Sequence, residues 1–277
     1  LTSISVLAKL FCFKKIKIIL FEHQILSKSY LNKRQRTSFI LKFLINSTFY
    51  FSYKVICVSN FVKLDIERML FYKKEIDVVY NPAYIENSTI SLTDSKIKTI
   101  WEGNYDLKIL CVGSLKIEKD HKTLIKAIKI VKKISNIKLK LLIFGEGPLE
   151  VELNNLIKSL KLQNDITIKK FNYDLCDWYY SCDLFILPSL HEGFANVIIE
   201  ALSFQKKIIA TKCGGPEEIL ENEKFGKLID INNPVMIANN IVNYKKLNYN
   251  NISLLNRAKE FSKEKISETI MKIIKSE

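Results

Sequence analysis

The sequence predicts an α/β fold of two domains, each built around a parallel β-sheet. Three observations support this prediction. From residue 107 onward, short β-branched runs alternate with helical patterns. A shorter alternation of the same kind ends near residue 82, and a segment rich in turn-forming residues lies between the two. Because strands that alternate with helices are typical of a parallel, doubly wound sheet, we expect two such domains that face a cleft.

The second alternation gives a complete domain, which we expect to span residues 107–254. The segments between its apolar runs, such as 121–134 and 149–160, carry apolar residues three or four positions apart, which indicates helices. The apolar runs themselves are typical of buried strands. These strands are expected at 107–112, 139–144, 166–169, 184–187, 207–210 and 226–230.

The first domain, residues 1–86, is expected to be shorter. Because the chain opens at Leu1 in the middle of a pattern, we expect this domain to be incomplete. Residues 87–106 are expected to form a linker, since turn formers and weak periodicity prevail there. Strands of the first domain are predicted at 15–21, 54–59 and 76–82, with helical segments around 38–51 and 60–73.

The apolar stretch 38–58 is a candidate for a transmembrane segment. Lys42, Asn46 and Lys54 interrupt it, and charges near the centre of a bilayer are costly. A buried helix that leads into a strand is therefore the favoured interpretation.

The charge balance is strongly basic, with 43 Lys and Arg residues against 29 Asp and Glu residues and a net charge of +14. Such a balance favours an anionic partner, for which nucleic acid, an acidic membrane face and phosphorylated ligands all qualify. A coding bias toward Lys is an alternative explanation. No nucleic-acid-binding motif and no interleaving of basic and aromatic residues is present, so we expect no nucleic acid partner.

The cysteines and histidines give no metal-binding pattern. The six cysteines contain no C-x-x-C pair, the chain has three histidines in total, and most cysteines sit in apolar runs. We therefore expect no metal and no disulfides, with the cysteines as small buried hydrophobes in a reducing cytoplasm.

The segment "HEGFANVIIEA", residues 191–201, carries two carboxylates after the strand expected at 184–187. Glu192 lies in the loop and Glu200 about one turn into the next helix. Apolar residues surround Glu200, and a buried carboxylate is costly unless a polar group meets it. Paired hydroxyls of a ribose or a hexose would suit such a carboxylate, whereas the alternative is a solvated helix residue. Gly193 and the helix start offer close backbone approach and free N–H groups to an anion.

Three other loops follow the carboxyl ends of expected strands, where open parallel sheets bind ligands. In "GSLKIEKDHKTL", Gly113 begins a turn and Lys119 stands where it could neutralise a diphosphate. "FGEGP", residues 144–148, is expected to close a pocket wall. In "TKCGGPEEIL", Gly214 and Gly215 permit close backbone approach.

Taken together, these segments resemble a large family of retaining glycosyltransferases (glycosyl transferases group 1, family four). The resemblance is carried by "VGSLKIEKDHKTLIKAI", "LLIFGEGPLEVELNNLI", "SCDLFILPSLHEGFANVIIEALSFQKKIIAT" and "CGGPEEIL", in order and spacing, and by the pattern of Glu, seven residues, Glu. It is strong over 107–230 and looser upstream. It implies a GT-B-like arrangement of two Rossmann-like domains. It further implies that the final helix, 255–277, packs on the first domain, which lacks its opening strand and Gly-rich loop.

The resemblance assigns roles around the donor sugar. It implies that Glu200 holds the ribose hydroxyls and that Glu192 contacts the donor sugar. His23, in "FEHQ", is similar to a histidine of the first domain near that sugar, with a simple strand-end residue as the alternative. Glu192 and His23 are thus the expected catalytic residues.

The remaining assignments concern the nucleotide. Lys119 matches the diphosphate-binding lysine of the family, beside Gly113, and Ser114 stands where many members carry an arginine. Phe171 falls where the base is usually held. The backbone groups expected to receive hydroxyls and the distal phosphate belong to Gly193, Phe194, Ala195, Asn196 and Val197.

The function that the resemblance implies is transfer of a hexose or N-acetylhexosamine from a UDP- or GDP-sugar to a glycan or lipid-linked acceptor. Transfer would retain the anomeric configuration, need no metal or other cofactor, and serve synthesis of cell-surface polysaccharide. The expected location is cytoplasmic, with peripheral binding to an anionic inner membrane face through "FKKIK" and "NKRQR". The alternative is an inactive, truncated remnant that still binds a nucleotide diphosphate.

Overall fold

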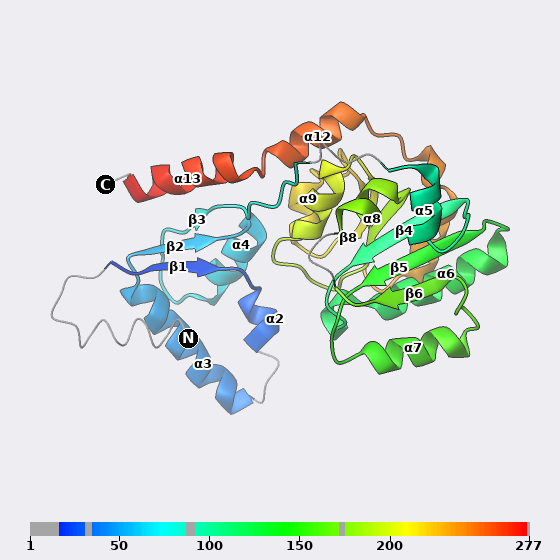
Figure 1. Ribbon diagram of the computed structural model, residues 1–277. Coiled ribbons are helices and arrows are strands. Elements are labelled where there is room, and N and C mark those ends of the chain that lie inside the picture. The colour runs from blue at the N-terminus through cyan, green and yellow to red at the C-terminus, as the bar shows by residue number, and fades with distance from the viewer. Residues whose placement is uncertain (1–16, 31–34, 87–91, 172–174, 276–277) are drawn as a thin grey trace. The chain divides into compact units, whose positions relative to one another are not determined.

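Two parallel β-sheets organise the chain in the computed structural model, which describes residues 17–30, 35–86, 92–171 and 175–275 (Figure 1). The contacts divide these residues into two units. Unit 1 comprises the residues up to Pro82, Glu192–Phe194 and the residues from Glu264, and unit 2 comprises Ala83–His191 and Ala195–Lys263. The predicted α/β fold with parallel sheets is confirmed.

Within the described residues, unit 2 contains a six-stranded parallel sheet of strand order β6-β5-β4-β7-β8-β9. Each strand lies where an apolar run predicts one. The runs are continuous because helices cover both faces of the sheet, so neither face turns polar (Figure 1). The strands are β4 (Leu107–Val112), β5 (Leu139–Phe144), β6 (Ile166–Lys169), β7 (Leu184–Leu187), β8 (Lys207–Thr211) and β9 (Lys227–Ile229).

The helices of unit 2 cover the sheet with their apolar sides. On one face, Leu107 and Ile109 of β4 belong to a cluster with Leu124 and Ile128 of α6 and Ile237 of α11, all fully buried. The elements between the strands are α5 (Asp94–Ile100), η1 (Ile117–Lys119), α6 (His121–Ile134), α7 (Glu150–Ser159), α8 (Cys176–Ser181), α9 (Asn196–Ser203) and α10 (Gly215–Ile219). After β9 follow α11 (Pro234–Val242), η2 (Tyr244–Lys246) and α12 (Asn251–Lys259).

Unit 1 holds a smaller parallel sheet, which has three strands in the described part of the chain, in the order β1-β2-β3. Helix α13 packs on this sheet, because Ile266 clusters with Ile56 and Val79 and because Lys54 Nζ donates to Ile273 O at 2.5 Å. The elements are β1 (Ile19–Glu22), α2 (Leu26–Tyr30), α3 (Gln35–Phe51), β2 (Lys54–Cys57), α4 (Asn60–Met69), β3 (Asp77–Val78) and α13 (Lys263–Lys275).

The stretch 38–58 forms helix α3 followed by strand β2, as the sequence predicts. The helix is buried on one side only, since Phe43 and Tyr50 are 62% and 63% exposed. On its buried side, Asn46 donates through Nδ2 to Met69 O at 3.2 Å and accepts from Phe71 N at 2.8 Å. Among the described residues, no helix is both long enough and apolar enough to cross a bilayer.

The segment expected as a linker contains helix α5, which the sequence did not indicate. Thr93 caps its start by accepting from Lys96 N at 3.4 Å. No residue of α5 is buried, so the helix has no apolar stripe to reveal it. Its anchor is the next residue, Trp101, which is fully buried and donates from Nε1 to the Ser181 hydroxyl at 2.8 Å.

Most of the described cysteines are buried, as the sequence predicts. Cys57, Cys111, Cys182 and Cys213 are buried, and Cys176 is partly buried. No disulfide joins cysteines of the described residues, and Cys12 lies outside them.

Candidate functional site

A cavity of about 460 Å³ opens at the carboxyl ends of β4, β5 and β6 in unit 2. Strands β5 and β6 follow β4 toward one edge of the sheet. Strand β7 then pairs with the opposite side of β4, and β8 and β9 continue toward the other edge. At such a reversal of strand order the connections diverge, which leaves the crevice where open parallel sheets bind ligands. The cavity is lined by Val112, Gly113, Ser114, Gly145, Glu146, Phe171 and Val197. Four of these residues are predicted site residues: Gly113, Ser114, Phe171 and Val197.

Two loops are joined by backbone hydrogen bonds along one wall of the cavity. Leu115 N donates to Glu146 O at 2.9 Å, and Leu149 N donates to Leu115 O at 3.0 Å. A side chain at Gly145 would overlap the carbonyl oxygen of Gly113, so only glycine allows this approach. The "FGEGP" turn therefore closes the wall of the cavity.

Lys119 lies beside the cavity at the end of η1. Its side chain packs against Gly113, where a Cβ atom would lie 3.5 Å from Lys119 Cδ. Asp120 follows in a left-handed conformation (φ 44°) and caps α6 by accepting from Thr123 N at 3.3 Å. A cation thus stands next to the loop that forms the cavity wall.

His121, which no sequence pattern singled out, forms a hydrogen bond to the same loop. It is 2% exposed, and its Nε2 lies 3.1 Å from Ser114 O. Because a carbonyl oxygen can only accept, Nε2 carries the proton of this hydrogen bond. Burial lowers the pKa of His121, so the imidazole is neutral.

Glu200 lies on α9 one turn after Val197, on the same side of the helix. Tyr179 Oη donates to Glu200 Oε2 at 2.7 Å. Burial raises the pKa of Glu200, and the hydrogen bond from Tyr179 opposes this rise. Glu200 is therefore a largely buried carboxylate with a phenol partner and not a solvated helix residue. Tyr179 lies in the "WYY" run, and no sequence pattern there indicates that this tyrosine reaches α9.

Helix α9 starts without a side-chain cap. Ala195 precedes Asn196 at the N-cap position and has no side-chain acceptor for the first N–H groups of the helix. Ala195 is buried and Asn196 is exposed. The N–H groups at this end of α9 therefore receive no hydrogen bond from the side chain of the N-cap residue.

The other predicted residues belong to unit 1. A side chain at Gly193 would overlap the carbonyl oxygen of His23, and the Ser59 hydroxyl donates to Gly193 O at 2.5 Å. Phe194 stacks on Tyr80, with ring centroids 5.2 Å apart and an interplanar angle of 10°. Unit 1 thus brings the exposed His23 and the segment Glu192–Phe194 together.

In the "TKCGGPEEIL" loop, the Glu217 carboxylate accepts hydrogen bonds from the backbone of the same loop. Glu217 accepts from Cys213 N at 2.9 Å and from Gly214 N at 2.8 Å, and Gly214 has a φ of +115°. The glycine adopts a backbone conformation that other residues rarely take, and the glutamate fixes it. Glu217 therefore shapes this loop.

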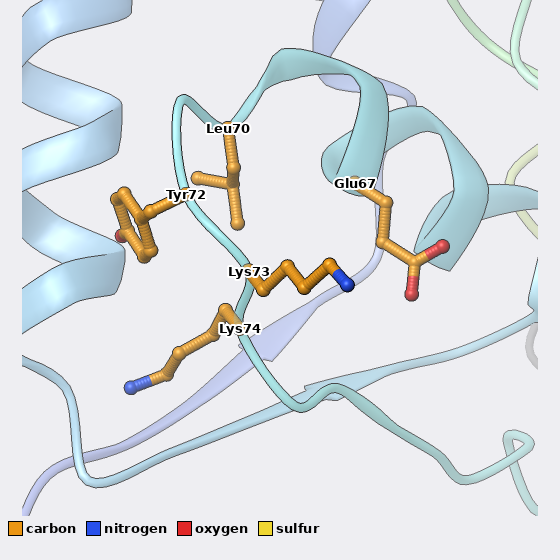
Figure 2. Close-up of a pocket in the computed structure, with 5 residues that line it drawn as sticks. All are labelled: Glu67, Leu70, Tyr72, Lys73 and Lys74. Atoms are coloured by element: carbon orange, nitrogen blue, oxygen red, sulfur yellow. The ribbon is translucent and has the colours of Figure 1, made fainter.

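A second cavity of about 330 Å³ lies in unit 1 and is lined by Glu67, Leu70, Tyr72, Lys73 and Lys74 (Figure 2). Figure 2 shows Lys73 reaching toward the carboxylate of Glu67, with Lys74 directed away from it. Tyr72 Oη donates to Asn46 O at 2.7 Å and Lys74 Nζ donates to Ser52 O at 2.8 Å, so both side chains tie this loop to α3 and its end. No predicted site residue lines this cavity.

Titratable side chains do not gather into a metal site in the part of the chain that the structure describes. No group of three His, Cys, Asp or Glu side chains has a suitable arrangement there. Among the lining residues of the unit 2 cavity Glu146 is ionisable, while Lys119 packs on Gly113 and Glu200 lies one helical turn from Val197.

Comparison with known families decides the classification. The family model for glycosyl transferases group 1 matches residues 95–268, which is more than half of the chain. The chain belongs to this family. The match includes the loops around the unit 2 cavity, together with Lys119, Glu192 and Glu200.

Two curated relatives match over most of this chain. Over 231 residues the chain is 28% identical to an uncharacterized glycosyltransferase of Methanocaldococcus jannaschii. This match covers 81% of the chain and 60% of the relative. Over 234 residues the chain is 30% identical to the N-acetylgalactosamine-N,N'-diacetylbacillosaminyl-diphospho-undecaprenol 4-alpha-N-acetylgalactosaminyltransferase of Campylobacter jejuni. This match covers 83% of the chain and 60% of the relative. The chain therefore spans 60% of the length of each of these relatives.

Among solved structures, the chain is similar to Anabaena HepE in complex with UDP-glucose. The TM-score is 0.84 at 21% sequence identity, and the match covers 100% of this chain and 76% of that chain. At this identity the likeness establishes the fold, and it confirms the predicted GT-B class.

Proposed function

We propose that this glycosyltransferase uses a nucleotide-diphospho-sugar as donor and binds the nucleotide in the unit 2 cavity. The observation that carries the proposal is a cavity at the strand-order reversal with two charged residues next to its lining: Lys119 packs on Gly113, and the largely buried Glu200 lies one helical turn from Val197. Family membership and the UDP-glucose bound to the similar HepE structure support it.

Each group at the cavity suits one part of such a donor. Lys119 would neutralise the diphosphate, aided by the Gly113–Ser114 loop and the uncapped start of α9. Glu200 would accept hydrogen bonds from the ribose hydroxyls. Phe171 lines the cavity and is 51% exposed, and its ring would stack on the base.

The finer features of the reaction are part of the same proposal. Glu192 and His23 would contact the donor sugar, a hexose or an N-acetylhexosamine carried by UDP or GDP. The bond from the anomeric carbon to the phosphate would break as the acceptor oxygen bonds on the same face, so that configuration is retained. The leaving phosphate would take the acceptor proton, and Lys119 with the α9 start would supply electrostatic stabilisation in place of a metal.

The acceptor is proposed to be a glycan or a lipid-linked sugar of cell-surface polysaccharide synthesis. The Campylobacter jejuni relative supports this choice, since its name specifies a diphospho-undecaprenol-linked acceptor. Calorimetric titration with UDP, GDP and ADP tests the donor side. We expect UDP or GDP to bind and ADP to bind more weakly, whereas a folded chain that binds neither UDP nor GDP would contradict the proposal.

We further propose that unit 1 attaches peripherally to an anionic membrane surface. Exposed aromatic side chains occur on α3 and after α4, where Phe43, Tyr50 and Phe71 are 62%, 63% and 67% exposed. Tyr50 also contacts Phe51 and Tyr72 edge to face. Aromatic rings beside lysines are typical of interfacial binding. Of the basic clusters "FKKIK" and "NKRQR", the described residues include only Lys17, Gln35 and Arg36.

Vesicle flotation measures this attachment. We expect the chain to float with vesicles that contain phosphatidylglycerol, and to be released as salt is raised from 0.1 to about 0.5 M, because screening weakens the attraction. The double variant Phe43→Ser with Tyr50→Ser should bind less. Equal flotation with purely zwitterionic vesicles would count against the proposal.

A further inference from the structure

A buried phenol, Tyr179, is bonded to the carboxylate of the candidate nucleotide site. Tyr179 lies on α8 and is 1% exposed, and its hydroxyl donates to Glu200 Oε2 on α9 at 2.7 Å. A hydroxyl is costly to bury unless it has a hydrogen-bond partner, and Glu200 is that partner. A phenylalanine would fill the same space without this requirement.

The ring of Tyr179 is held by its aromatic neighbours. It stacks on Phe204 with centroids 5.7 Å apart and an interplanar angle of 10°, and it lies 5.8 Å from the ring of Phe185. Phe185 is fully buried, and Phe204 is 5% exposed. A ring packed in this way has little freedom to rotate, so the position of its hydroxyl is fixed.

Glu200 is engaged through one oxygen only. Among the described residues, the hydrogen bond from Tyr179 to Oε2 is the sole hydrogen bond or ion pair of this carboxylate. Glu200 also shares its helix face with Val197, which lines the cavity. A carboxylate fixed at one oxygen can offer the other to a ligand in a single orientation.

We propose that Tyr179 is a positioning residue of the nucleotide site. Its hydroxyl holds Oε2 of Glu200 so that the carboxylate presents Oε1 to the vicinal hydroxyls of a ribose. The inference rests on the proposed function and extends it, because it makes the site select ribonucleotides over nucleotides that lack these hydroxyls.

Two physical effects follow from this bond. The bond restrains the Glu200 side chain before the ligand binds. Less rotamer freedom is then lost on binding, which favours affinity. The bond also opposes the rise in the pKa of Glu200 that burial causes, and so favours the ionised acceptor. Tyr179 remains the donor, because burial and the Glu200 carboxylate raise its pKa well above 10.

The test compares Tyr179→Phe with the wild type in affinity for UDP or GDP, whichever binds, and for its 2′,3′-dideoxy analogue. We expect Tyr179→Phe to bind the ribonucleotide about tenfold more weakly. Its affinity for the dideoxy analogue should stay unchanged, since that ligand offers no hydroxyl to Glu200. Tyr180→Phe is the matched control, because Tyr180 is the next residue and is 39% exposed, and it should alter neither affinity.

A pH profile gives a second readout that a purely structural role would not move. Without the phenol donor the pKa of Glu200 should rise further. As the solution is acidified, the ribonucleotide affinity of Tyr179→Phe should therefore begin to fall at a higher pH than the affinity of the wild type does.

Should Tyr179→Phe fail to fold, Glu200→Asp tests the same geometry. Its shorter side chain cannot keep the Tyr179 bond and also reach the ligand, so it should lose discrimination between the two nucleotides.

The possible outcomes separate the inference from the proposed function. If the folded wild type binds neither UDP nor GDP, the proposed function fails and the inference fails with it. If the wild type binds and discriminates between the two nucleotides but Tyr179→Phe does so equally well, only the inference is overturned. Equal losses for the ribonucleotide and the dideoxy analogue would likewise overturn it, because they would show that Tyr179 only supports the fold.

Discussion

Replacing Glu200 with Ala is expected to weaken binding of UDP or GDP by about 1.5–3 kcal/mol, which is roughly 10- to 100-fold. The change removes the charged acceptor that is proposed for the ribose hydroxyls. It also leaves the buried Tyr179 hydroxyl without its partner, which should lower the free energy of unfolding by about 1–3 kcal/mol. Calorimetry measures the affinity, and thermal unfolding measures the stability.

The control for this prediction is Glu200→Gln, which keeps an oxygen that can accept from Tyr179. It should be nearly as stable as the wild type but bind the ribonucleotide more weakly, because the charge is lost. A Glu200→Ala variant that is folded and binds with unchanged affinity would contradict the ribose assignment.

The raised pKa of Glu200 gives opposite pH dependences for binding and for stability. The ionised carboxylate is the better acceptor, so nucleotide affinity should fall as the pH drops through its pKa, which burial places above 4.5. The folded state binds this proton more readily than the unfolded state does. Between the unfolded and folded pKa values, the contribution of Glu200 to the stability of the ligand-free chain therefore increases as the pH falls. Glu200→Gln should show neither trend.

Replacing Lys119 with Ala is expected to weaken binding of the nucleotide diphosphate about tenfold or more, and to leave the affinity for the corresponding nucleoside nearly unchanged. The proposed partner of Lys119 is the diphosphate, which the nucleoside lacks. The effect should shrink at high salt, because an ammonium–phosphate contact near the surface is screened. Titration of both ligands at two salt concentrations measures it.

Lys122→Ala is the matched control for Lys119→Ala. It removes the same charge three residues further on, but Lys122 Nζ is paired with Glu152 Oε1 at 2.5 Å. Its loss should not alter nucleotide affinity. Equal losses of nucleoside and diphosphate affinity in Lys119→Ala would instead show that Lys119 acts through the fold.

The sequence could predict the elements of unit 2 because both faces of its sheet are covered. Such strands read as unbroken apolar runs, and helices such as α6 show a clear apolar stripe. The position of the cavity, at the carboxyl ends of the strands, could be predicted because the strands are parallel. Glu200 could be singled out because a carboxylate among apolar neighbours is conspicuous.

Other features depend on contacts between distant parts of the chain. Helix α5 buries none of its own residues, and its anchor is the bond from Trp101 to Ser181, which lie far apart in sequence. Tyr179 and Glu200 belong to separate helices, and nothing in "WYYS" distinguishes Tyr179 from Tyr180. His121 reads as one more residue at a helix start, and its support of Ser114 O appears only once the loop is folded back.

The most direct test of nucleotide binding in the unit 2 cavity is to follow backbone amide chemical shifts of the ¹⁵N-labelled chain during titration with UDP and GDP. One of the two nucleotides should shift the amide resonances of Gly113, Ser114, Gly145, Val197 and Glu200. Saturable shifts confined to Glu67, Leu70, Tyr72, Lys73 and Lys74 around the other cavity (Figure 2), with the first group unmoved, would contradict it.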